Sequence, residues 1–325
     1  MNRLEELQDY LFATLSKQVG LPDVPVVFIL GAPRTGSTLF YQLLVRTYDF
    51  FYFSNLINDA FSTTPIVGAV LQGQMAAPES IGFHSQKGKT KGLWGPSEAS
   101  FVFRYWFGGQ HPSETFSRRL LPGRREHFEK TMEAVFALTS SPILTKNAWN
   151  CFRVKALTEI FRKVAFIWIR RDLRDSALSD LQCRYDSGGP TTWNSATTAN
   201  CEEIRKLPYW EQVVEQQYSY MTAISSSLEL HANRTHTQIW YEDLCSDPAG
   251  ELTRIEQCLR SSGVPISQVE PLRLTLTPSS GPDEIPEDRE RIDRYVAENL
   301  ERFGPCLCSA RREPLVNANQ GLRHE

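Results

Sequence analysis

The chain has 325 residues, of which 41% are hydrophobic and 22% are charged, a composition typical of a globular protein. The formal net charge of -3 and the isoelectric point near 6.1 argue against nucleic acid as the main partner, which usually requires a basic excess. Any anion binding must therefore come from a local cluster of positive charge. The seven cysteines match neither a disulfide framework nor a zinc site, and we expect no metal.

Residues 1–20 predict an amphipathic helix, with leucines 4, 7, 11 and 15 on one face. Charges run through the middle of this stretch, and it lacks the apolar region of a secretory signal peptide. No window of the sequence approaches the roughly 20 apolar residues that a membrane span needs. We therefore expect a cytoplasmic protein without a membrane span.

Apolar segments that alternate with helical patterns indicate the fold class. Four segments predict buried strands, at 26–30, 142–145, 164–169 and 236–241. Helices are predicted to follow these strands and to occupy 128–138, 209–230 and 289–302. Such alternation predicts an α/β fold in three layers, with a central parallel sheet flanked by helices.

The remaining stretches predict loops and set the domain organisation. We expect loops and short helices rather than sheet over 54–100, and a mobile surface segment over 186–207, which is rich in Gly, Ser, Thr and Asn. Residues 263–325 read as an irregular and helical extension, with five prolines between 263 and 286. Because there is no internal repeat and no clean linker, we expect a single domain over 1–325.

The segment 31–38, Gly-Ala-Pro-Arg-Thr-Gly-Ser-Thr, lies between the first predicted strand and a helix. It has the form of a P-loop, in which backbone N–H groups and a helix N-terminus surround an anion. Ser37 follows Gly36 where a nucleotide-hydrolysing P-loop has lysine, and the cation comes earlier, as Arg34. Taken alone, the pattern also fits a tight turn without a ligand.

Positions 33–38 resemble the phosphosulfate loop, P-[RK]-[ST]-G-[ST]-[ST], of the sulfotransferases that use 3′-phosphoadenosine 5′-phosphosulfate (PAPS). The resemblance covers roughly residues 25 to 262, with gaps, and is nearest the bacterial and carbohydrate-type branch. It implies a P-loop NTPase-like fold, and a 5′-phosphosulfate site made by Arg34, Thr35, Gly36, Ser37 and Thr38, with Arg34 also catalytic. The aromatic residue that stacks on adenine in the cytosolic branch would fall at Leu39, so another residue must take that role.

A second element follows the strand at 164–169, where Arg171 is separated by eight positions from Ser179. It resembles the family signature that binds the 3′-phosphate, and the arginine fork suits that group. An ordinary helix start, with Asp172 and Asp175 near the positive end of the helix dipole, is the alternative. The order of the two elements along the chain favours the phosphate site. The stretch 241–248, Y-E-D-L followed by D-P, also resembles the family, and we interpret it as a strand end and a helix cap.

The residue that removes the acceptor proton is less clear. Many family members have a K-T-H sequence after a strand, and here Lys146 occurs without the histidine, either as a catalytic cation or as an ordinary strand-end lysine. Glu98 resembles the P-x-E carboxylate base of some sulfotransferases, and we expect aromatic neighbours to bury it, although a helix-start role fits equally. His84 and His111 are the reserve candidates.

The sequence thus predicts a sulfotransferase that moves a sulfuryl group from PAPS to a hydroxyl or amine of a carbohydrate, lipid or small metabolite. Two alternatives stay open: a P-loop kinase or NTPase, and a nucleotide-binding module without catalysis. The missing lysine after Gly36 disfavours the kinase. The sequence specifies neither the acceptor nor the oligomeric state.

Overall fold

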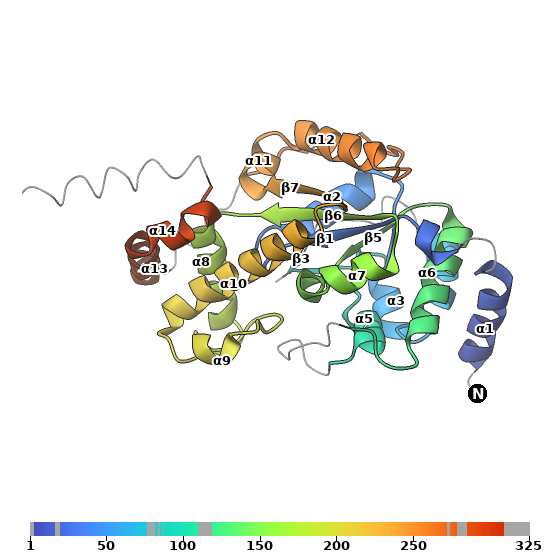
Figure 1. Ribbon diagram of the computed structural model, residues 1–325, viewed down its shortest axis with the longest axis horizontal. Coiled ribbons are helices and arrows are strands. Elements are labelled where there is room, and N and C mark those ends of the chain that lie inside the picture. The colour runs from blue at the N-terminus through green and yellow to red at the C-terminus, as the bar shows by residue number, and fades with distance from the viewer. Residues whose placement is uncertain are drawn as a thin grey trace, which may run out of the picture.

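A five-stranded parallel sheet forms the centre of the computed structural model, in the order β2-β5-β1-β6-β7. The strands are β1 (Val26–Leu30), β2 (Phe51–Tyr52), β5 (Ile143–Lys146), β6 (Val164–Arg170) and β7 (Thr235–Trp240). Helices cover both faces (Figure 1), which confirms the predicted α/β fold. The structure describes residues 3–16, 20–76, 82–83, 85–86, 88–109, 119–271, 274–277 and 285–308.

The side chains of β1 alternate between two hydrophobic cores, because successive residues of a strand point to opposite faces. Val26, Phe28 and Leu30 pack in one core, and Val27 and Ile29 pack in the other. None of the five is more than 1% exposed. Burial on both faces explains why this strand reads as one continuous apolar run.

One face of the sheet is covered by α2 (Ser37–Thr47), α11 (Tyr241–Ser246) and α12 (Pro248–Ser261), as Figure 1 shows. Helix α12 begins where the sequence predicts, because the Asp247 carboxylate accepts a hydrogen bond of 2.9 Å from the backbone N–H of Gly250. The helix buries Leu252, Ile255 and Leu259 at helical spacing against the sheet.

The other face carries a larger set of helices. They include α3 (Asn55–Ala60), α4 (Pro65–Met75), α5 (Ser100–Phe107), α6 (Arg125–Thr139), α7 (Val154–Ile160) and α10 (Tyr209–Leu230). None of the helices within the described ranges is long and apolar enough to cross a membrane.

Helix α1 (Arg3–Leu15) packs on the outer side of α6 and α4 (Figure 1). Its buried residues are Gln8 and Phe12, whereas Leu4 and Leu7 remain exposed. The predicted apolar face is therefore wrong for the first half of the helix. The side-chain amide of Gln8 donates to the backbone carbonyl of Thr63 over 3.1 Å, so a polar residue is accommodated where leucine was expected.

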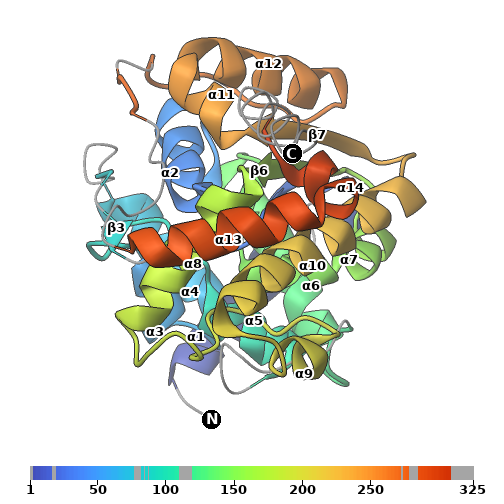
Figure 2. The same cartoon turned by 90° about the vertical axis from the view of Figure 1, so that its left-hand side faces the viewer.

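Helices α8 (Leu173–Tyr185) and α13 (Pro286–Glu298) pack against each other and against α10 at the end of the sheet where the strands finish. Figure 2 shows α13 crossing in front of α8 and α10 from that side. The shorter α14 (Leu300–Phe303) follows α13, so the predicted final helix at 289–302 is two helices. Helices α13 and α14 lie beside the end of the sheet where the chain passes from β6 into α8.

The prediction of no sheet over 54–100 is wrong at one point. Two short strands, β3 (Ser85–Gln86) and β4 (Lys89–Thr90), pair in antiparallel fashion within that region. Gly88 lies between them with a φ of +83°, a conformation that glycine adopts without steric cost. This reversal places the segment after β4 beside the end of β5.

The prediction of a surface segment over 186–207 is also wrong for part of its length. Residues 196–198 are buried, and α9 (Cys201–Ile204) follows them. The side-chain amide of Asn194 donates to Asp180 Oδ1 over 2.6 Å, and Gln216 Nε2 donates to the Asn194 carbonyl, also over 2.6 Å. The polar side chains of this segment suggested a solvated loop. They instead form hydrogen bonds with residues of α8 and α10.

A fully buried ion pair lies beneath the same segment. Arg184 Nε donates to Asp180 Oδ2 over 3.1 Å within α8, and neither side chain is exposed. Arg184 also donates to Gln216 Oε1 of α10 over 2.5 Å and to the Pro190 carbonyl over 3.3 Å. One guanidinium thus joins α8, α10 and the segment between them, because an arginine has five N–H donors.

Removing one partner of this pair should destabilise the protein strongly. In Asp180→Ala the Arg184 guanidinium stays buried without its counter-charge, so the free energy of unfolding should fall by about 3–5 kcal/mol. Arg125→Ala is the control, because it breaks the exposed Arg125–Glu129 pair at the same i,i+4 spacing and should cost less than about 1 kcal/mol. Urea denaturation would measure both, and equal losses would contradict a structural role for the buried pair.

Candidate active site

The carboxyl ends of four neighbouring strands meet at one edge of the sheet. The parallel register pairs Ile29 of β1 with Lys146 of β5, and Arg170 of β6 with Trp240 of β7. The residues that follow these strands therefore lie along one edge, which is the place where open α/β sheets bind ligands. The loop 31–36, Lys146, Arg171 and Tyr241 all come from this edge.

The loop after β1 has the backbone of an anion site. Arg34 and Gly36 have φ values of +69° and +80°, and α2 begins directly after Gly36. Left-handed residues of this kind turn successive N–H groups toward one point, next to the positive end of the helix dipole. The Thr35 hydroxyl donates to the Ala32 carbonyl over 2.8 Å, so this side chain closes the loop on itself.

The two predicted phosphate elements are in contact. Arg34 Nε donates to the Ser179 hydroxyl over 3.0 Å, and Arg171 Nη1 donates to the Arg34 carbonyl over 2.8 Å. Burial lowers the pKa of the Arg171 guanidinium, and the Asp175 carboxylate acts in the opposite direction. The loop, the strand end and α8 thus meet in one cationic cluster around Arg171, which is buried.

Tyr241 contacts both elements, a role that the sequence analysis missed. Its ring centroid lies 4.8 Å from the Arg171 guanidinium carbon. A Cβ atom on Gly36 would lie 2.4 Å from Tyr241 Cδ2, so glycine is required there for packing as well as for its φ angle. The position of Tyr241 directly after the last strand was the available signal, because the ends of parallel strands gather at one edge.

Glu242, the next residue, supports the start of α8. Its Oε1 atom accepts a hydrogen bond of 3.0 Å from the backbone N–H of Asp172. Asp172 in turn caps α8, accepting from the Arg174 N–H over 3.0 Å. The Y-E-D-L stretch therefore begins helix α11, where we expected a strand end, and it supports the arginine–serine element through Glu242.

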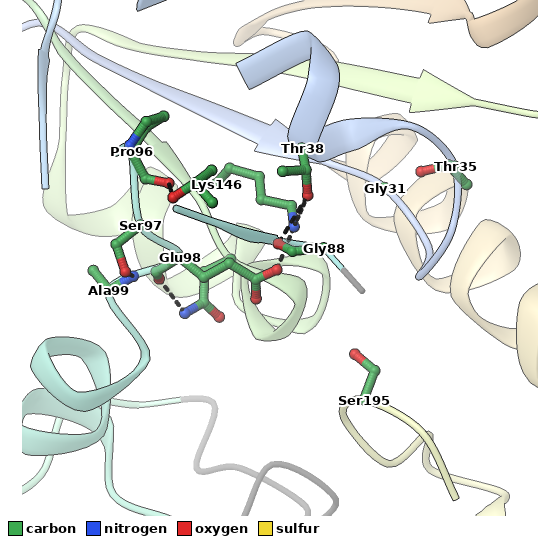
Figure 3. A network of polar contacts seen from close by, with 12 residues as sticks. Gly31, Thr35, Thr38, Gly88, Pro96, Ser97, Glu98, Ala99, Lys146 and Ser195 are labelled. Atoms are coloured by element: carbon green, nitrogen blue, oxygen red, sulfur yellow. Dashed lines mark hydrogen bonds and ion pairs between the residues drawn. The ribbon is translucent and has the colours of Figure 1, made fainter. Parts of the chain in front are cut away.

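Lys146 and Glu98 form an ion pair beside the loop (Figure 3). Lys146 Nζ also donates to the Thr38 hydroxyl over 3.3 Å, and that hydroxyl donates to the Gly88 carbonyl over 3.1 Å. The Lys146 side chain is 10% exposed and that of Glu98 is 31% exposed. The expected burial of Glu98 among aromatic residues is therefore wrong, because the carboxylate turns toward the lysine and solvent.

The backbone around Glu98 is fixed in two ways. Asn147 Nδ2 donates to the Glu98 carbonyl over 2.7 Å, which ties this residue to the end of β5. Ala99 follows with a φ of +51° as the N-cap of α5, so Glu98 precedes the helix. The carboxylate is thereby directed at Lys146, and it does not cap α5.

The structure gives no further candidate for a catalytic base, nucleophile or metal site among the residues that it describes. His84 and His111 lie outside the described residues. Burial raises the pKa of the Cys151 thiol, which lies 3.4 Å from the Gly31 backbone nitrogen, to about 12, so it stays protonated and is not a nucleophile. Within the described ranges, no group of three or more His, Cys, Asp or Glu side chains is arranged to hold a metal ion.

Substitution of Gly36 tests the contact with Tyr241. Gly36→Ala should lower stability through its positive φ and additionally through overpacking against the ring, which costs about 1–3 kcal/mol. Gly263 is a matched control, with a φ of +81° and nothing within 4 Å of an added Cβ. Gly263→Ala should therefore lose only the backbone part. Thermal denaturation would compare the two variants, and an equal loss would show that the ring moves aside freely.

Solved structures of bacterial sulfotransferases resemble this chain at low sequence identity. Sulfotransferase STF9 from Mycobacterium avium is 14% identical with a TM-score of 0.48, over 95% of this chain and 79% of that one. A sulfotransferase from Alicyclobacillus acidocaldarius is 14% identical with a TM-score of 0.44, over 86% and 94%. The sulfotransferase domain of the Synechococcus PCC 7002 olefin synthase is 16% identical with a TM-score of 0.42, over 75% of each chain.

The sequence itself gives a more specific result. No curated protein matches it. The sequence model of the Sulfotransferase family matches residues 25–262, which include β1, the loop after it, Lys146, the arginine–serine element and Tyr241. On this match over most of its length, the chain belongs to the sulfotransferase family.

Proposed function

We propose that the protein transfers a sulfuryl group from PAPS to a hydroxyl or amine of an acceptor. The observation that carries this proposal is the contact of Arg34 with both Ser179 and Arg171, which joins two anion-binding elements into one site. PAPS carries a phosphosulfate at its 5′ position and a phosphate at its 3′ position. A site for a nucleoside triphosphate needs only the first element.

The donor set fits both groups. For the 5′-phosphosulfate we propose the backbone N–H groups and side chains of the loop, namely Arg34, Thr35, Gly36, Ser37 and Thr38. For the 3′-phosphate we propose Arg171 and Ser179, since a planar guanidinium and a hydroxyl donate to phosphate oxygens from two directions. The Thr35 side chain would act through the loop geometry, because its hydroxyl already donates to Ala32.

The ion pair of Lys146 and Glu98 supplies the chemistry of transfer. Glu98 would take the proton of the acceptor while the acceptor oxygen forms a bond to sulfur. The bond between sulfur and the bridging phosphate oxygen breaks, and its electron pair stays on adenosine 3′,5′-bisphosphate. Lys146 and Arg34 would stabilise the negative charge that develops on that oxygen, as cations do in phosphoryl transfer.

This pair also bears on the alternatives. A module that only binds a nucleotide has no need for a carboxylate and a lysine held side by side next to Thr38. A kinase would be expected to bind ATP as well as it binds the bisphosphate. The geometry of this ion pair therefore favours an enzyme over a module that only binds a nucleotide. A comparison of ATP and bisphosphate binding distinguishes the sulfotransferase from a kinase.

Ligand-induced stabilisation tests the donor. Adenosine 3′,5′-bisphosphate well above its Kd should add about 3 kcal/mol to the free energy of unfolding, and ATP much less, because ATP satisfies only one element. Arg171→Ala should abolish that preference. Differential scanning fluorimetry would measure the shifts, and equal shifts with ATP and the bisphosphate would refute the two-element site.

Substitution of the ion pair tests the base. Glu98→Gln should keep the stabilisation by bisphosphate but lower kcat by roughly 10²-fold or more, because the amide cannot accept a proton. The pH–rate profile should lose its acidic limb, since the amide does not titrate. Lys146→Ala should lower kcat across the whole pH range. Transfer of radiolabelled sulfate from PAPS to panels of glycans, lipids, phenols and tyrosyl peptides gives the rates.

Near-normal turnover in Glu98→Gln would identify a different base. His84→Ala and His111→Ala are then the variants to measure, and a collapse of kcat in one of them would assign the proton transfer to that histidine.

A further inference from the structure

Backbone strain is concentrated at the candidate active site. In the part of the chain that the structure describes, four residues other than glycine have positive φ angles, namely Arg34, Ala99, Ser140 and Ser195. Arg34 belongs to the loop 31–36 after β1, which we call the anion loop, and Ala99 follows Glu98. Ser140, in contrast, ends α6. Positive φ is unfavourable for residues with a Cβ atom, and such residues gather at functional sites. Ser195 has no part in the function proposed above.

Ser195 lies across the site from the ion pair. Figure 3 shows it on the segment opposite Glu98, Lys146 and Thr38, with its hydroxyl oxygen directed toward the Glu98 carboxylate. The residue as a whole is half-buried. An acceptor that gives its proton to Glu98 would lie between these two side chains.

The backbone on each side of Ser195 is held by hydrogen bonds. Asn194 donates from its side chain to Asp180 and accepts at its carbonyl from Gln216, both over 2.6 Å. The Ala196 carbonyl accepts from the Tyr220 hydroxyl over 2.9 Å. These contacts come from α8 and α10 and end on the buried Asp180–Arg184 pair, which explains how a strained residue is kept in place.

The Ser195 hydroxyl lies beside the phenol of Tyr220. The Tyr220 oxygen lies 2.9 Å from the Ala196 carbonyl and 3.5 Å from Ser195 Oγ, so its proton goes to the carbonyl. Burial raises the pKa of Tyr220 well above its usual range, the hydrogen bond with Ser195 opposes this rise, and the Asp180 and Glu98 carboxylates add to it. Tyr220 therefore stays a neutral donor, and it lies within electrostatic reach of Glu98.

We propose that Ser195 is an acceptor-binding residue that hydrogen-bonds a second polar group of the acceptor while Glu98 takes the reacting hydroxyl. This inference rests on the proposed function. A side chain that offers one donor and two lone pairs opposite the base fits an acceptor with neighbouring hydroxyls, as in sugars and polyols. A simple phenol has no second group for Ser195, so the site is assigned to a hydroxyl-rich acceptor.

The test compares acceptors in one assay with labelled PAPS. Ser195→Ala should lower kcat/KM for unsulfated mono- and disaccharides at least 10-fold, mainly through KM. Transfer to 4-nitrophenol and release of sulfate to water should change less than twofold, because neither presents a second hydroxyl. Stabilisation by adenosine 3′,5′-bisphosphate should be unchanged, since the proposal gives Ser195 no contact with the donor.

Two glycine variants separate recognition from folding. Ser195→Gly removes the hydroxyl and relieves the positive φ, so it should show the same loss for saccharides with an unchanged or higher melting temperature. Ser140→Gly relieves a φ of +57° away from the site and should leave all rates unchanged.

Three results would overturn the inference: saccharide kcat/KM within twofold of wild type in Ser195→Ala, an equal loss with every acceptor, or a wild-type protein that sulfates 4-nitrophenol or water but no saccharide. A wild-type protein that neither binds the bisphosphate nor releases labelled sulfate would instead refute the proposed function.

Discussion

The parallel register of the central sheet is the constraint on which the candidate site depends. Each strand contributes the residue that follows its carboxyl end, and the register sets all of these residues along one edge. The pairing of Ile29 with Lys146 places the lysine next to the start of the anion loop. A shift of β5 by one residue would turn Lys146 to the opposite face, because side chains alternate along a strand. The apolar cores on both faces fix that register, so hydrophobic packing positions the charged groups.

Much of the fold follows from local patterns in the sequence. The apolar run of β1 and the bounds of α10 agree with the prediction, because each depends on a periodicity that the chain itself carries. The P-loop pattern and the spacing of Arg171 and Ser179 also identify groups that the structure brings into contact. The proximity of these two elements was predictable, because the carboxyl ends of parallel strands lie at the same edge of the sheet.

The failures have a common physical origin. The segment 186–207 has the composition of a solvated loop, yet its Asn194 side chain and carbonyl are bound by residues of α8 and α10 that no local pattern can indicate. The same holds for Gln8 in α1, which is buried because Thr63 provides an acceptor. In each case tertiary hydrogen bonds allow polar residues to be buried, whereas the propensities of these residues predict exposure to solvent. The position of Ser195 was not predictable for the same reason.

Helix α8 serves both sides of the site. Ser179 contacts Arg34 of the anion loop, and the next residue, Asp180, belongs to the buried pair that holds the Ser195 segment. Successive helix residues point about 100° apart, so one short stretch can reach the loop after β1 and the Ser195 segment at once.

The contact between Gly36 and Tyr241 has an evolutionary consequence. Two positions far apart in the sequence occupy the same space, so a larger residue at 36 is compatible only with a smaller one at 241. That smaller residue would also remove the ring from beside the Arg171 guanidinium. A lineage in which position 36 changed would have to alter the segment after β7 as well. A change at position 36 that came first would pass through an unstable intermediate, so the two motifs are expected to change in a set order.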